Sequence, residues 1–97
     1  MRIIALRTLR EFWQRHPDSE QSLRAWYANV RRATWTSPAD VKISYRNASI
    51  LPANRAVFNI KGNDYRLVVV IDYTYQVIYA RFVGTHRDYD RIDATTI

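Results

Sequence analysis

The residues of this chain that could do chemistry are concentrated between positions 57 and 90. They comprise three cations, an imidazole and a phenol: Lys61, Arg66, Arg81, His86 and Tyr89. Asp90 follows the phenol directly, and Gly84 precedes the imidazole by two positions. Cleavage of a phosphodiester needs proton transfer and stabilisation of added negative charge, which these side chains can supply. The segment is therefore suited to phosphodiester chemistry.

Two turn signals divide the segment into three strands of alternating polarity. The turns are Lys61-Gly62-Asn63 and Asp72-Tyr73-Thr74, and both glycine and asparagine adopt turn conformations at little cost. Each strand has one apolar set of side chains, which is Ile78, Ala80 and Phe82 in the third strand, and these sets should face a helical layer. The opposite face is then expected to be open and to carry Asn59, Lys61, Arg66, Tyr79 and Arg81.

The elements before these strands are predominantly helical, and apolar side chains form a stripe at helical spacing along each of two helices. A short strand is expected over residues 2–4, followed by a helix that ends at His16-Pro17, because a residue before proline avoids the helical region. Asp18 and Gln21 resemble the capping box of a second helix. A short helical turn near residues 41–45 and a loop over residues 46–54 follow. The prediction is an α+β fold in the order β-α-α-β-β-β, an antiparallel sheet with two N-terminal helices packed on one face.

Composition narrows the class of partner. The 97 residues predict a single domain over 1–97. Fifteen Lys and Arg against nine Asp and Glu give a net charge of +6, and all the cations except Lys42 and Lys61 are arginines. The planar guanidinium pairs well with phosphate, which favours nucleic acid or an acidic partner, although a basic surface can also serve solubility alone. The absence of cysteine excludes disulfides and a thiolate nucleophile.

The histidines favour acid–base chemistry over metal binding. His16 and His86 are too far apart in sequence for a metal motif, so neither a metal nor another cofactor is expected. Histidine titrates near neutrality, which makes His86 the best acid–base candidate, although a loop histidine often has no task. With no signal peptide and no apolar stretch of transmembrane length, we expect a cytoplasmic protein with no membrane partner.

These residues together resemble the HigB family of bacterial toxin–antitoxin toxins, part of the wider RelE-like group. The resemblance runs from Arg2 to about Asp90 and is carried by three blocks: residues 57–63 (VFNIKGN), 65–67 (YRL) and 81–86 (RFVGTH) with Tyr89-Asp90. It implies a RelE-like fold and an endoribonuclease that cleaves mRNA on the translating ribosome. It also implies a cognate helix-turn-helix antitoxin, with operator DNA bound only through the toxin–antitoxin complex.

The resemblance and the residues together suggest roles in metal-free cleavage. Arg66 and Arg81 would stabilise the phosphate, with help from Lys61, while His86 would transfer a proton. Tyr89 would assist by hydrogen bonding or stacking, and Asp90 would orient His86. Asn59, Asn63 and Tyr79 would join Lys61 in contacting RNA. The alternative is a non-catalytic basic module of the same fold that holds RNA or an acidic protein.

Overall fold

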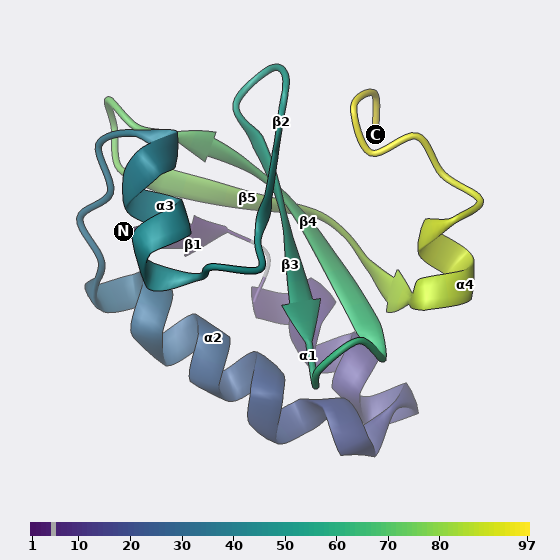
Figure 1. The fold of residues 1–97 in the computed structure, drawn as a ribbon. Coiled ribbons are helices and arrows are strands. Elements are labelled where there is room, and N and C mark those ends of the chain that lie inside the picture. The colour runs from purple at the N-terminus through teal and green to yellow at the C-terminus, as the bar shows by residue number, and fades with distance from the viewer. Residues whose placement is uncertain (5) are drawn as a thin grey trace.

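Residues 1–4 and 6–97 are described by a computed structural model. The elements are β1 (Arg2–Ile4), α1 (Leu6–Arg15), the 3₁₀ turn η1 (Pro17–Ser19), α2 (Glu20–Arg32), α3 (Pro38–Ser44), β2 (Ser49–Leu51), β3 (Arg55–Ile60), β4 (Tyr65–Asp72), β5 (Val77–Thr85) and α4 (His86–Tyr89). The α+β class is confirmed, with the long helices α1 and α2 beside a twisted sheet (Figure 1). No helix in the described residues is long and apolar enough to cross a membrane.

The sheet differs from the prediction at both of its edges. Its five strands lie in the order β1-β5-β4-β3-β2. β1 runs parallel to β5, so the sheet is mixed rather than antiparallel throughout, and the long helical connection after β1 permits this pairing. At the other edge, the expected loop over 46–54 contains β2, which pairs with β3. Three residues are too few to show the alternation by which a strand is recognised.

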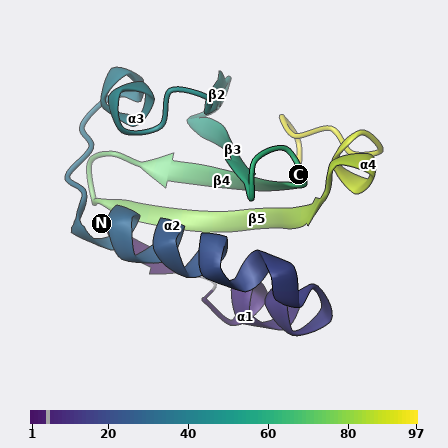
Figure 2. The ribbon, with the colours of Figure 1, turned by 60° about the horizontal axis from the view of Figure 1, so that its bottom comes forward.

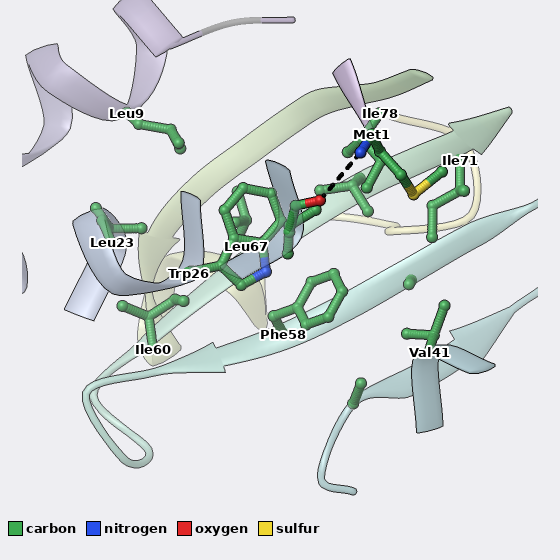
Figure 3. Close-up of a cluster of buried hydrophobic side chains, with 14 of the residues drawn as sticks. Met1, Leu9, Leu23, Trp26, Val41, Phe58, Ile60, Leu67, Ile71 and Ile78 are labelled. Atoms are coloured by element: carbon green, nitrogen blue, oxygen red, sulfur yellow. Dashed lines mark hydrogen bonds between the residues drawn. The ribbon is translucent and has the colours of Figure 1, made fainter. Parts of the chain in front are cut away.

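The main core lies between the helices and the sheet. The helices bury Leu9, Phe12, Trp13, Leu23, Trp26 and Val30, and the sheet contributes Phe58, Leu67, Ile71 and Ile78 among others (Figure 3). These are the stripes and strand faces that the sequence predicts. Full burial of one large apolar side chain contributes about 1.5–3 kcal/mol, so this cluster is the main source of stability.

The opposite side of the sheet, which we call the second face, is covered in its middle. A smaller cluster buries Val57 and Val68 against Ala94, with Tyr89, Ile92 and Ile97 partly buried around them. Figure 2 shows α1 and α2 on one side of β4 and β5, and α4 with the C-terminal segment on the other. The expectation that this face is open is therefore wrong where residues 89–97 cross it.

A β-bulge changes which side chains of β5 reach the second face. Val69 of β4 pairs with Ala80, but the next residue, Val68, pairs with Phe82, which leaves Arg81 as the extra residue. Phe82 packs in the second cluster, so its predicted place among the helix-facing residues is wrong. One inserted residue reverses the alternation beyond it, and no sequence pattern marks this bulge.

Candidate active site at the Arg66 end of the sheet

Strand register places Arg66 among the predicted polar residues. Asn59 of β3, Arg66 of β4 and Gly84 of β5 are direct partners in one row across the sheet. Direct partners share a face, and this row lies two residues along β4 from buried Val68. The row is therefore on the second face, beside the edge of the C-terminal cover. We call this region the Arg66 end.

The Arg66 guanidinium is held by backbone carbonyls of the neighbouring turn. Its Nη1 donates to the carbonyl oxygen of Asn63 at 2.9 Å and to that of Tyr65 at 3.3 Å. The side chain is half-buried, whereas Asn63 is exposed. These bonds restrict the guanidinium, and its other nitrogens make no hydrogen bond to the described residues, which suits a preorganised phosphate donor.

Gly84 creates the room for this arrangement. A Cβ at Gly84 would lie 2.5 Å from the end of the Phe82 ring and 3.2 Å from the Cβ of Asp88. The absent side chain thus lets Phe82 fold over the strand and lets α4 begin directly beside the Arg66 row. Any larger residue would push one of these neighbours away.

His86 begins α4 at this same end. Thr85 caps the helix by accepting a hydrogen bond from the Asp88 amide at 3.1 Å, and the His86 amide donates to the carbonyl oxygen of Asp64 at 3.2 Å. The imidazole Nε2 lies 3.6 Å from Asp90 Oδ1, and the histidine side chain is 55% exposed. The pairing of His86 with Asp90 that the sequence suggests is therefore present in the structure. An imidazole open to solvent beside a carboxylate is suited to proton transfer.

The other arginine of the proposed pair lies in the bulge. Arg81 is exposed, and alternation from Tyr79 puts it on the second face. It is three positions from Gly84 along β5, or roughly 10 Å at the usual rise of a strand. Side chains as long as arginine can converge over that separation, so Arg66 and Arg81 could approach one phosphate.

The two tyrosines of the predicted site occupy different surroundings. Tyr89, the last residue of α4, is partly buried in the second cluster. Tyr79 pairs with Val70 in a row four residues along β4 from Arg66, or about 13 Å away. The row of Val68 and Phe82, which the C-terminal segment covers, lies between the row of Tyr79 and the row of Arg66. The predicted polar face is thus divided rather than continuous.

Lys61 belongs to a different set of contacts. Its Nζ lies 2.9 Å from Asp18 Oδ2 and 3.5 Å from Asp64 Oδ2. Because Lys61 sits in the turn with φ of 52°, it leaves the strand alternation and reaches toward the helical layer. Its predicted place on the polar face with Arg66 is therefore wrong, although it remains beside the turn that holds Arg66.

Asp18 has a role that the sequence pattern did not reveal. It was expected to cap α2, but the N-cap is Ser19 and no side chain makes a cap bond there. Asp18 instead accepts hydrogen bonds from the Tyr65 hydroxyl and from Lys61. These bonds, the Tyr65 bond foremost, lower the pKa of Asp18, and the carboxylate in turn raises the pKa of both Tyr65 and Lys61.

Arg55 is a second residue that sequence analysis did not single out. Its Nη1 donates to the carbonyl oxygen of Ile97, which ties the C-terminal segment to β3. Its Nε is buried and has no hydrogen-bond partner among the described residues. The 42 positions between the two residues leave no local signal from which this contact could be predicted.

Metal coordination has no cluster of ligands to support it in the described part of the chain. Across residues 1–4 and 6–97, no group of three or more His, Cys, Asp or Glu side chains is placed to hold a metal ion. The Arg66 end offers cations, an imidazole with a carboxylate, and polar amides. Such a set can bind a phosphate and move a proton.

Comparison with known families identifies the group to which this arrangement belongs. A family model described as HigB_toxin, the RelE-like toxic component of a toxin-antitoxin system, matches residues 19–92. The chain belongs to the HigB toxin family. The matched region contains every residue of the predicted site, from Asn59 to Tyr89. As a HigB-family toxin component, the protein has an antitoxin as its partner, which confirms that part of the sequence prediction.

Curated HigB proteins are similar to it over nearly their whole length. They include the mRNA interferase toxin HigB of Escherichia coli (strain K12) and the mRNA interferase HigB of Escherichia coli O157:H7 and of Shigella flexneri. Each is 28% identical over 93 residues, which are 93% of this chain and 88% of the relative. The resemblance seen in the sequence is thereby confirmed as membership of the family.

Proposed function

We propose that this HigB-family chain is an endoribonuclease that cleaves mRNA on the translating ribosome and so inhibits translation. The names of its curated relatives as mRNA interferases support this function. The single structural observation that carries it is the convergence of Arg66 and His86. Arg66 pairs with Gly84, two residues before His86, and Asp64 joins the turn beside Arg66 to the His86 amide.

The reaction is an internal transfer at phosphorus. A base removes the proton of a ribose 2′-hydroxyl, and the 2′-oxygen forms a bond to the adjacent phosphorus. The bond from phosphorus to the 5′-oxygen breaks, and an acid protonates the leaving oxygen. The products carry a 2′,3′-cyclic phosphate and a 5′-hydroxyl. Arg66 and Arg81 stabilise the charge added to the phosphate, and His86 transfers a proton while Asp90 orients it.

The surrounding residues hold the RNA. Asn59 lies beside Arg66 in the same row, and Asn63 and Lys61 lie in the turn next to it. Tyr89 supports α4 and its histidine, while the exposed Tyr79 is placed to stack on a base farther along the strand. This chemistry uses neither a metal nor another cofactor.

The partners follow from the same proposal. The cognate antitoxin carries a helix-turn-helix domain and neutralises the toxin, while operator DNA is bound only through the toxin–antitoxin complex. The ribosome presents the message to the Arg66 end. The toxin acts in the cytoplasm, where ribosomes and message are found.

Programmed ribosomes carrying a defined message provide the test. Wild-type protein should cut the message to leave a 5′-hydroxyl, which a polynucleotide kinase labels without prior phosphatase treatment. A message with a 2′-deoxyribose at the scissile nucleotide should resist cleavage. A chelator selective for transition metals, which leaves ribosomal magnesium in place, should not change the rate. A 5′-phosphate product would contradict internal transfer, and binding without cleavage at any codon would favour a non-catalytic RNA-binding module.

A further inference from the structure

We infer that Asp18 is a positioning residue that anchors the turn between β3 and β4 and thereby holds Arg66 and His86 in place for catalysis. This inference rests on the proposed cleavage function. It assigns a task to a residue of the helical layer that is not part of the Arg66 end.

Both oxygens of the Asp18 carboxylate are engaged by the β3–β4 hairpin. Oδ1 accepts the hydrogen bond of the Tyr65 hydroxyl, and Oδ2 accepts that of Lys61 at 2.9 Å. The two donors lie at opposite sides of the turn, one at its start and one at the first residue of β4. The carboxylate therefore fastens both sides of the turn to η1, which connects α1 to α2.

Tyr65 makes this anchor rigid. Its side chain is only 7% exposed, and its ring meets Phe12 edge-on with centroids 5.3 Å apart. The ring of His16 stacks on Phe12 with centroids 4.4 Å apart and also lies 5.6 Å from the Tyr65 ring. A hydroxyl held by packed rings presents a fixed donor, so the bond to Asp18 sets where β4 begins.

The anchored turn is connected directly to the candidate catalytic groups. Arg66 follows Tyr65 in the chain and binds the carbonyl oxygens of Asn63 and Tyr65. On the other side, Lys61 reaches Asp64 at 3.5 Å, and the carbonyl oxygen of Asp64 accepts the His86 amide at 3.2 Å. A displacement of the turn would therefore move the arginine and the start of α4 together.

The variants Asp18→Ala, Tyr65→Phe and their combination test this inference. Tyr65→Phe removes only the hydroxyl, so the double variant leaves no buried hydroxyl without its acceptor and keeps the test valid if Asp18→Ala alone unfolds. Asp40→Asn is the matched control, because Asp40 is also an aspartate that reaches solvent, although only partly, and it accepts two hydrogen bonds from Thr36 of the loop before α3.

Single-turnover cleavage on programmed ribosomes gives the first measurement. Misplacement of reacting groups by about 1 Å can cost about 100-fold, so we expect Asp18→Ala and Tyr65→Phe each to lower the maximal rate by up to about 100-fold. The ribosome concentration that gives half-maximal rate should change little. The double variant should be no slower than the slower single variant, because Asp18→Ala already removes the one bond that Tyr65→Phe breaks. Wild-type rates, independent multiplicative losses, or an equal loss in Asp40→Asn would overturn the inference.

Amide hydrogen exchange gives a second measurement that needs no activity. The amides of Asp64 and His86 are reporters, since they bond to the carbonyl oxygens of Lys61 and Asp64 respectively. Both should exchange faster in Asp18→Ala and remain unchanged in Asp40→Asn. Unchanged exchange in Asp18→Ala would show that Asp18 does not hold the turn. If wild-type protein cut no message, the proposed function would fail while the exchange data would still decide whether Asp18 anchors the hairpin.

Discussion

Truncation of Arg66 to alanine separates the role of this residue in catalysis from its role in the fold. In the folded protein its guanidinium makes two hydrogen bonds, both to backbone carbonyls of the neighbouring turn. A typical hydrogen bond contributes about 0.5–1.5 kcal/mol, and here the half-exposed site lets water replace much of that. We therefore expect Arg66→Ala to lower the free energy of unfolding by only about 1 kcal/mol.

The expected effect on cleavage is much larger. Loss of one preorganised donor to a charged transition state costs about 2.7–4 kcal/mol, or roughly 100- to 1,000-fold in rate. Arg81→Ala should have an effect of the same order, since Arg81 is exposed and would act only on substrate. His86→Ala should slow cleavage by about 100-fold or more if the imidazole transfers a proton.

Single-turnover cleavage and thermal melting, measured side by side, distinguish these roles. A change of 1 kcal/mol shifts the melting temperature of a domain this small by about 4–8 °C. Arg7→Ala is the matched control for lost charge, because Arg7 is an 89% exposed arginine of α1 that bonds to Glu11. It should cleave at close to the wild-type rate.

Three outcomes would refute this reasoning. Near-wild-type rates in both Arg66→Ala and Arg81→Ala would remove the phosphate site. A rate loss accompanied by a collapsed melting transition would mean that the arginines are structural. A comparable loss in Arg7→Ala would point to net charge, rather than position, as the cause.

Four further outcomes are expected. Val68→Ala should cost about 1.6 kcal/mol for two buried carbons plus a cavity term in urea denaturation, whereas an open sheet face would give a change within about 0.5 kcal/mol. The pKa of Asp18 is lowered, so its anchor adds stability above the ordinary carboxyl pKa and loses it as pH falls through the lowered value. In Asp18→Asn, the free energy of unfolding should therefore fall less steeply as the pH is lowered into the acid range. An unchanged pH dependence would contradict this. With a net charge of +6, association with the antitoxin should slow as salt rises in stopped-flow mixing, and a salt-independent rate would exclude a charge-led encounter. Tyr79→Ala should weaken RNA binding by about 1–3 kcal/mol without lowering the maximal rate, and a rate loss equal to that of Arg66→Ala would contradict their separation.

The regular elements could be predicted because their patterns are long. The stripes of α1 and α2 and the alternation in β3 and β4 each repeat over at least six residues, and all of them bury the expected side chains. The three-residue β2, the four-residue α4 and the parallel pairing of β1 are not marked in this way. They depend on contacts between distant segments, which a local pattern does not contain.

The candidate site was predictable to the extent that it follows from hairpin register. Asn59 and Arg66 face each other because the turn between β3 and β4 pairs them. The partner of Lys61 was not predictable, since Asp18 is 43 positions away and carries the sequence pattern of a helix cap. The burial of Val68 under the C-terminal segment could not be predicted either, because Ala94 and its neighbours show no strand or helix pattern.

The bulge in β5 explains how the site can contain both arginines. Arg81 and Gly84 are three positions apart, and in a regular strand an odd separation puts two residues on opposite faces. The extra residue opposite Val68 removes that conflict, so Arg81 and the Gly84 row beside Arg66 share the second face. The same insertion sends Phe82 into the second cluster, where it packs under the C-terminal segment that leads back to Tyr89 and His86. The bulge thus brings the proposed phosphate-binding groups to one face. It also packs the C-terminal segment, which follows the helix that contains His86, the proposed proton donor or acceptor.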